Sequence, residues 1–132
     1  MNTADENVEI IRRGYQAFNT GDLKTLTELF DPNASWYTPG HSSVAGGRQG
    51  RDAVFGQFGR YAGETGGTFK AELKDVLKSE NGRVIGIHHN SAQRNGKRLD
   101  THCCIVFELS DGRVVEGREF IFDLHNWDQF WA

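Results

Sequence analysis

The chain has 132 residues, 37% of them hydrophobic and 25% charged, with a formal net charge of −3 and a pI near 5.9. This length and composition suit one globular domain with one core, so we expect residues 1–132 to form a single domain. The weakly acidic balance and the lack of a long apolar run argue against nucleic acid and membrane partners.

The N-terminal part of the chain predicts two helices. Thr3 and Glu6 have the spacing of a capping box, and apolar residues then recur at intervals of three and four until Gly21 ends the helix. Asp22 is the predicted N-cap of a second, short helix, which the turn residues 31–33 end. The first residues lack the basic and apolar regions of a signal peptide, so we expect a cytoplasmic protein.

Strand, loop and helix are predicted in turn over the next part of the chain. A short strand covers residues 34–38, and a glycine- and serine-rich loop carrying His41 covers residues 39–50. A third helix is predicted from about residue 52 to residue 62, because apolar side chains recur there at helical spacing.

The rest of the sequence predicts strands joined by tight turns. The predicted strands cover residues 68–79, 84–94, 99–109 and 114–122. The pairs between them, each typical of a two-residue type I′ hairpin turn, are Asn81-Gly82, Asn95-Gly96 and Asp111-Gly112. Three helices followed by three hairpins predict an α+β domain, in which the helices pack in the concave face of a curved antiparallel sheet.

Glu119 stands out because it lies in the middle of the last predicted strand. Strict alternation places Gly117, Ile121 and Asp123 on its face, and puts Val114, Glu116, Arg118, Phe120 and Phe122 on the other. A carboxylate among apolar residues has two interpretations. It forms a salt bridge on a solvent-exposed face of the sheet, or it acts as an acid or base in an apolar cavity. In the cavity, desolvation would raise its pKa.

His88 shares a strand face with Gly86 and Asn90. Gly86 removes bulk beside the imidazole and would leave room for a ligand. If His88 faces Glu119 across a pocket, the two side chains can divide the acid and base roles. The alternative is a hydrogen-bonded core histidine. His89 points to the opposite face of the strand.

Four stretches of the sequence carry a family resemblance. They are YQAFNTGD at residues 15–22, LFDPNASW at 29–36, GRDAV at 50–54 and VFELSDGRV at 106–114. With the order of elements, they make the chain similar to the nuclear transport factor two-like superfamily, and within it to SnoaL-like polyketide cyclases and ketosteroid-isomerase-like proteins. The resemblance implies a cone-shaped α+β barrel around an apolar pocket, on a fold that hosts isomerases, cyclases, hydrolases and non-catalytic binders.

The resemblance singles out particular positions. SnoaL-type cyclases use an acid of the last strand as base, at the place of Glu119. Steroid isomerases carry their base carboxylate where this chain has Thr38, and their helix-one tyrosine falls at Gly14, next to Tyr15. Limonene-type epoxide hydrolases match the last-strand motif at residues 118–120, but their earlier Arg-x-Asp pair falls at residues 86–88.

These comparisons give a predicted site. Glu119, His88 and Tyr15 are the expected catalytic side chains, with Tyr15 donating a hydrogen bond to a substrate oxygen. The expected substrate contacts are Trp36, Thr38, Phe18, Phe58, Tyr61, Asn90, Cys103 and Ile121. His41 is a further candidate from the loop over the pocket mouth, and Asp123 is expected to cap the turn into the aromatic tail.

The preferred hypothesis is a cofactor-free acid–base enzyme of isomerase, cyclase or hydrolase type, acting on a small hydrophobic carbonyl or hydroxyl compound. The alternative is a non-catalytic ligand-binding or accessory module, which a side chain plugging the cone would favour. Metal binding is not expected, because the histidines and cysteines lack a ligand motif. Cys103 and Cys104 are expected to be reduced thiols. A homodimer is expected through the outer sheet face, where Phe120 and Phe122 point.

Overall fold

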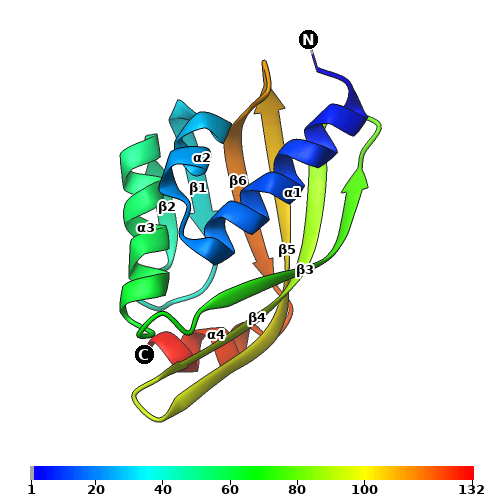
Figure 1. Ribbon diagram of the computed structural model, residues 1–132. Coiled ribbons are helices and arrows are strands. Elements are labelled where there is room, and N and C mark those ends of the chain that lie inside the picture. The colour runs from blue at the N-terminus through cyan, green and yellow to red at the C-terminus, as the bar shows by residue number, and fades with distance from the viewer. Residues whose placement is uncertain (1) are drawn as a thin grey trace.

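A computed structural model of the chain describes residues 2–132 (Figure 1). Its helices are α1 (Ala4–Thr20), α2 (Leu23–Leu29), α3 (Arg51–Gly63) and α4 (Leu124–Trp131). Its strands are β1 (Phe30–Thr38), β2 (Gly46–Gln49), β3 (Lys70–Lys78), β4 (Val84–Arg94), β5 (Lys97–Ser110) and β6 (Arg113–Ile121).

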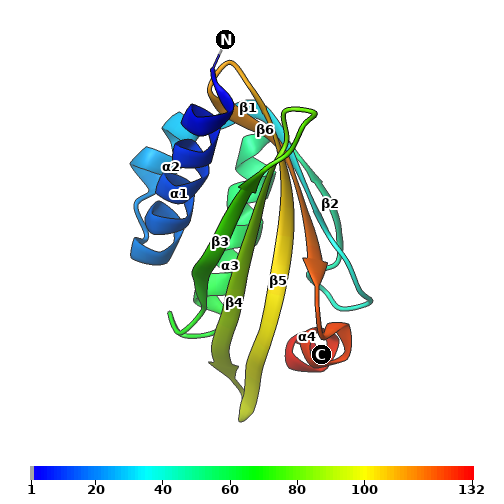
Figure 2. The ribbon, with the colours of Figure 1, turned by 90° about the vertical axis from the view of Figure 1, so that its right-hand side faces the viewer.

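The six strands form one curved, open sheet in the order β2-β1-β6-β5-β4-β3. Helices α1, α2 and α3 lie together against one face of this sheet, as Figure 2 shows from the side. The α+β prediction, with helices in the concave face of a curved sheet, is confirmed. The sheet is mixed, however, and not purely antiparallel. Strand β6 lies between β1 and β5, and it pairs parallel with β1 and antiparallel with β5.

The predicted helix signals act as expected. The Thr3 hydroxyl accepts a hydrogen bond from the Glu6 amide at 3.1 Å, and the Glu6 carboxylate accepts one from the Thr3 amide at 2.9 Å. Gly21 ends α1 in the left-handed conformation with φ of 70°. The Asp22 side chain caps α2 through the Thr25 amide. Residues 31–33 differ from the prediction, because α2 already ends at Leu29 and these residues lie inside β1.

The hairpin turns agree with the prediction at two of three places. Asn95-Gly96 and Asp111-Gly112 both have positive φ at each residue, as a type I′ turn requires. At Asn81-Gly82 only the glycine has positive φ, so the type I′ prediction is wrong there. Instead, Ser79 donates its amide to the Arg83 carbonyl and closes a wider turn.

Two elements were missed by the sequence analysis. Strand β2 lies in the predicted loop, because its GGRQ sequence has no apolar alternation and it is held by backbone pairing with β1, to which the Gln49 side chain adds one hydrogen bond at the Asn33 carbonyl. Helix α4 lies in the tail, where Asp123 caps it by accepting from the Asn126 amide, as was expected of that side chain.

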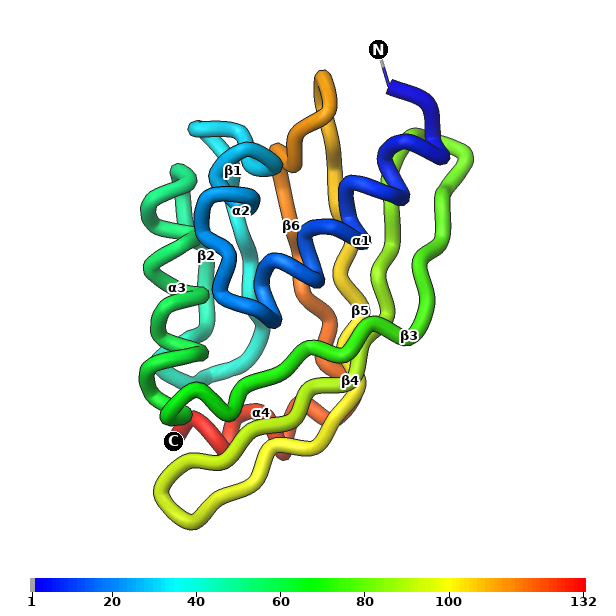
Figure 3. The backbone as a smooth tube through the Cα atoms, viewed as in Figure 1, coloured from blue at the N-terminus to red at the C-terminus, as the bar shows by residue number. Residues whose placement is uncertain are grey.

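Helix α4 closes one end of the molecule. Its buried side chains, which pack with Tyr61, Phe69 and Leu99, are Trp127, Phe130 and Trp131. Figure 3 shows the β4–β5 hairpin reaching past the end of β3 to the region of α4. There Arg94 donates to the Phe130 carbonyl at 2.9 Å and Lys97 to the Ala132 carbonyl at 2.8 Å. The tail therefore packs on its own chain. None of the helices in residues 2–132 has the length and hydrophobicity to cross a membrane.

A bulge corrects the predicted faces of the last strand. Glu108 pairs with Glu116 and Leu109 with Val114, so Val115 is the extra residue. Val114 consequently lies buried on the same face as Gly117 and Glu119, contrary to strict alternation. Phe120 and Phe122 point outward as predicted, with 49% and 65% of their surfaces exposed.

Candidate active site

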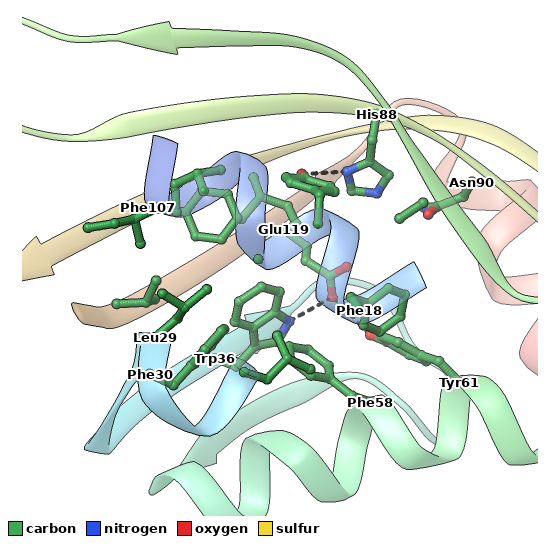
Figure 4. A pocket seen from close by; sticks show the side chains of 18 of the residues that line it. Phe18, Leu29, Phe30, Trp36, Phe58, Tyr61, His88, Asn90, Phe107 and Glu119 are labelled. Carbon is green, nitrogen blue, oxygen red and sulfur yellow. Dashed lines mark hydrogen bonds between the residues drawn. The ribbon is translucent and has the colours of Figure 1, made fainter. Parts of the chain in front are cut away.

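An apolar cavity of about 60 Å³ lies between the inner face of the sheet and the helices (Figure 4). Aromatic and aliphatic side chains make most of its wall, among them Phe18, Leu29, Phe30, Trp36, Phe58 and Phe107. The polar side chains that line it are Tyr15, Tyr61, His88, Asn90 and Glu119. Polar groups in so apolar a wall are the arrangement typical of a small-molecule site.

Glu119 is held by hydrogen bonds through one of its two oxygens. Its Oε2 accepts from Trp36 Nε1 at 3.1 Å, from Thr38 Oγ1 at 2.7 Å and from the Tyr61 hydroxyl at 2.9 Å. Its Oε1 makes no hydrogen bond with the described residues. No lysine or arginine of residues 2–132 forms an ion pair with Glu119, which rules out the salt-bridge reading of this side chain.

Burial sets the proton affinity of Glu119. The side chain is only 4% exposed, and desolvation raises the pKa of its carboxyl above the ordinary value. Hydrogen bonds from Thr38, Trp36 and Tyr61 oppose that rise, because each stabilises the anion. With Oε2 saturated by donors, Oε1 is the oxygen that can take up or give a proton.

Two glycines let aromatic rings approach the sheet closely. A Cβ at Gly117 would collide with the six-membered ring of Trp36, the side chain whose Nε1 donates to Glu119. A Cβ at Gly86 would meet the Tyr15 hydroxyl at 2.7 Å. The space beside His88 that was expected for a ligand is therefore taken by Tyr15.

His88 and Tyr15 form a buried pair. The Tyr15 hydroxyl lies 2.7 Å from His88 Nδ1. Burial raises the pKa of Tyr15 well above 10 and lowers the pKa of His88 to about 4, so the phenol is protonated and the imidazole neutral at pH 7. Because a phenol is a strong donor, we assign Nδ1 as the acceptor, which places the ring proton on Nε2.

Asn90 is the side chain of the cavity that lacks partners. It is fully buried, and neither its amide oxygen nor its amide nitrogen makes a hydrogen bond. The amide lies near His88, where it opposes the fall in the histidine pKa, but the contact falls short of hydrogen-bond geometry. A buried amide without partners costs about 1–3 kcal/mol. A ligand oxygen or N–H group in the cavity would relieve that cost.

The sheet register fixes the spacing of these groups. Glu119 on β6 pairs with Ile105 on β5, which pairs with Gly86 on β4, two residues from His88. Glu119 and His88 thus project from one face of the sheet, two strands apart and offset by two residues, or about 12 Å apart at the backbone. Both side chains line the same cavity.

A family model described as a SnoaL-like domain matches residues 11–117. The chain belongs to the SnoaL-like family. An uncharacterized protein of Mycobacterium tuberculosis is 35% identical over 98% of this chain and 99% of its own length. The structure of Bal32a, from a soil-derived mobile gene cassette, is 66% identical, with a TM-score of 0.97 over 99% of this chain and all of that one. A candidate SnoaL-like polyketide cyclase from Jannaschia shares the fold, at 18% identity and a TM-score of 0.77 over 97% and 93%.

The other predicted residues of this SnoaL-like chain fall outside the cavity wall. Thr38 serves as a donor to Glu119. Cys103 and Ile121 pair with each other across β5 and β6 and belong to the surrounding core. His41 is exposed, and its backbone amide donates to the Asp128 side chain. In residues 2–132 no cluster of three metal-ligating side chains occurs.

Gln57 is a buried polar residue that the sequence analysis missed. It is 1% exposed, and its Nε2 donates to the Val44 carbonyl at 2.7 Å and to the Tyr61 hydroxyl at 3.1 Å. By occupying the Tyr61 oxygen, Gln57 directs the Tyr61 proton to Glu119. The available signal was its place four residues before Tyr61, on the apolar side of the third helix.

We expect His88 to make the SnoaL-like fold less stable in mild acid. Between its ordinary pKa of 6.5 and about 4, the unfolded chain binds a proton that the folded chain does not. Stability therefore falls as the pH decreases through this window, by roughly 2 kcal/mol at pH 5 for this one group. Glu119, with its raised pKa, acts in the opposite direction.

Urea unfolding of the wild type and of His88→Gln at pH 7.5 and pH 5 measures this contribution. The variant should lose clearly less stability on acidification than the wild type. Equal losses in the two proteins would show that His88 does not carry the effect.

Proposed function

We propose that this SnoaL-like protein is a cofactor-free acid–base enzyme that moves a proton at the carbon next to the carbonyl group of a small hydrophobic compound. The observation that carries the proposal is Glu119: a buried carboxylate with one oxygen held by three donors and the other free, in an apolar cavity. We also propose that it acts in the cytoplasm.

The proposed step uses three side chains. Glu119 Oε1 takes the proton from the carbon, and the C–H electron pair moves to form a carbon–carbon double bond, leaving negative charge on the carbonyl oxygen. His88 Nε2–H and the Asn90 amide N–H donate to that oxygen. Return of the proton from Glu119 to the same or another carbon completes an exchange or an isomerisation. In a cyclisation, the carbanion would bond to a second carbonyl carbon, the C=O electron pair would move to that oxygen, and the oxygen would take the proton from Glu119.

The charges of the site favour this direction of transfer. The raised pKa of Glu119 makes it a stronger base than an exposed carboxylate, which suits removal of a proton from carbon. A neutral imidazole and a neutral amide donate hydrogen bonds without placing a cation beside the base. The unpaired Asn90 amide nitrogen needs an acceptor, which the carbonyl oxygen of a ligand supplies.

A non-catalytic binding module is the second candidate. The size of the cavity favours its accessory form, because about 60 Å³ holds only a few waters and leaves little room for a substrate. Phe18 and Phe58 also meet edge to face at 5.3 Å between ring centroids in the wall. A ligand of useful size must displace such rings.

Hydrogen–deuterium exchange tests the proposal without knowledge of the natural substrate. Cyclohexenone, 1-tetralone, 2-tetralone and acetophenone are incubated with the protein in D₂O, and loss of the signal next to the carbonyl is followed by NMR. Protein-dependent exchange of a bound ketone supports the enzyme. Saturable binding with no exchange at any pH from 6 to 9 would favour the binding module.

We also propose a homodimer through the outer sheet face. Phe120 and Phe122 stand exposed there, and Phe122 lies 6.0 Å from the His102 ring. Burial of these two rings is worth roughly 1.5–3 kcal/mol each. Sedimentation of the wild type should show two chains, and Phe122→Asp should give monomers, whereas Leu23→Asp on the helical side should not. A wild-type monomer at micromolar concentration would refute the dimer.

A further inference from the structure

The cavity adjoins a much larger groove on the helical side of the molecule. The groove measures about 730 Å³, against about 60 Å³ for the cavity. It runs between α3 and the turn from α1 to α2, elements that lie side by side in Figure 1. Apolar side chains make its wall, among them Leu23, which is 59% exposed, and Phe55.

Four side chains line the groove and the cavity alike: Phe18, Leu26, Phe58 and Phe69. Phe18 and Phe58 are only partly buried, and their edge-to-face contact forms part of the partition between the two spaces. Rotation of either ring would join the groove to the cavity that holds Glu119 and Asn90.

Glycines keep the α3 side of the groove open. A Cβ built at Gly56 or Gly59 meets no atom within 4 Å, and both residues line the groove. Charged groups occur only as Asp52 and Lys70 in its lining. Asn19 and Thr20 are its uncharged polar side chains, and the rest of the lining is apolar and leaves room for a chain of methylene groups.

We propose that the groove binds an extended apolar chain of the ligand, while the carbonyl end of the same molecule enters the cavity between Phe18 and Phe58. The inference rests on the proposed function for the carbonyl end. It assigns the ligand class as a carbonyl compound with an elongated hydrocarbon substituent. Such a ligand is too large for the cavity alone, and the groove provides the additional volume that it needs.

A homologous series of alkyl phenyl ketones tests this assignment. Dissociation constants of acetophenone, butyrophenone and hexanophenone are measured by calorimetry with the wild type, Gly59→Leu and Gly63→Leu. Leucine at position 59 fills the groove, whereas Gly63 lies on the same helix outside it. Neither glycine has positive φ or a neighbour within 4 Å of a Cβ, so both variants should fold.

In the wild type, affinity should rise with chain length by up to roughly fourfold per buried methylene. Gly59→Leu should keep the affinity for acetophenone within about twofold and lose the gain of the longer ketones, while Gly63→Leu should behave as the wild type. Equal affinity of the wild type for all three ketones, or the same rise of affinity with chain length in Gly59→Leu, would overturn the groove assignment and leave the proposed function standing. Failure of all three ketones to bind would contradict both the groove assignment and the proposed function.

Discussion

Glu119→Gln should slow ketone proton exchange by roughly 10²–10⁴-fold and leave ketone affinity nearly unchanged. The amide oxygen of glutamine can still accept from Trp36, Thr38 and Tyr61, so the donors that hold Glu119 keep a partner. The amide NH₂ group then stands where Oε1 was and cannot remove a proton from carbon. Because Glu119 has no cationic partner, the substitution leaves no buried charge unpaired, and Tm should hold or rise.

Glu116→Gln is the matched control on the same strand. Its carboxylate faces the other side of β6, 4.0 Å from the Arg118 guanidinium, and should contribute nothing to exchange. Exchange, Tm and affinity are measured together for the two variants and the wild type. Unchanged exchange in Glu119→Gln, or a variant that no longer folds, would end the assignment of Glu119 as the base.

Asn90→Leu should stabilise the protein and weaken its activity. The substitution removes an amide that has no hydrogen-bond partner in the folded chain and replaces it with an apolar group of similar shape. Relief of that cost should raise the free energy of unfolding by about 1–3 kcal/mol, and Tm by about 3 °C or more. Loss of one donor to the developing oxyanion should slow exchange by roughly 10²–10³-fold.

Gln57→Leu should move stability in the other direction. Gln57 is as deeply buried as Asn90, and its amide oxygen likewise has no partner, but its amide nitrogen donates to the Val44 carbonyl, to the Tyr61 hydroxyl and, at 3.5 Å, to the Thr38 hydroxyl. Leucine removes the unpaired amide oxygen but also takes the amide donor from these acceptors, and because that loss is the larger one, Tm should fall. Thermal unfolding of the two variants beside the wild type gives the comparison. A drop in Tm for Asn90→Leu comparable to that for Gln57→Leu would show that Asn90 is satisfied within the protein and does not await a ligand.

Local chemistry in the sequence determined most of the elements. The Thr3–Glu6 capping box, Gly21 and Asp22 set the ends of α1 and α2 through contacts between near neighbours. Asn95-Gly96 and Asp111-Gly112 set two hairpins, because few other pairs adopt positive φ at both positions. Alternation of side chains along β6 correctly placed Glu119 on the inner face of the sheet, because the bulge at Val115 comes before it. Strand β2 and helix α4 escaped prediction, because one depends on backbone pairing with β1 and the other on burying three aromatic rings at the end of the sheet.

The sequence by itself determined only part of the candidate site. The sequence pointed to Glu119, His88, Tyr15 and Asn90, and all four line the cavity. Only the tertiary structure decided that Trp36, Thr38 and Tyr61 donate to one oxygen of Glu119, that Tyr15 fills the space over Gly86, and that Asn90 has no partner. Hydrogen bonds between residues up to 83 positions apart depend on sheet register and ring packing, and neither is set by local sequence.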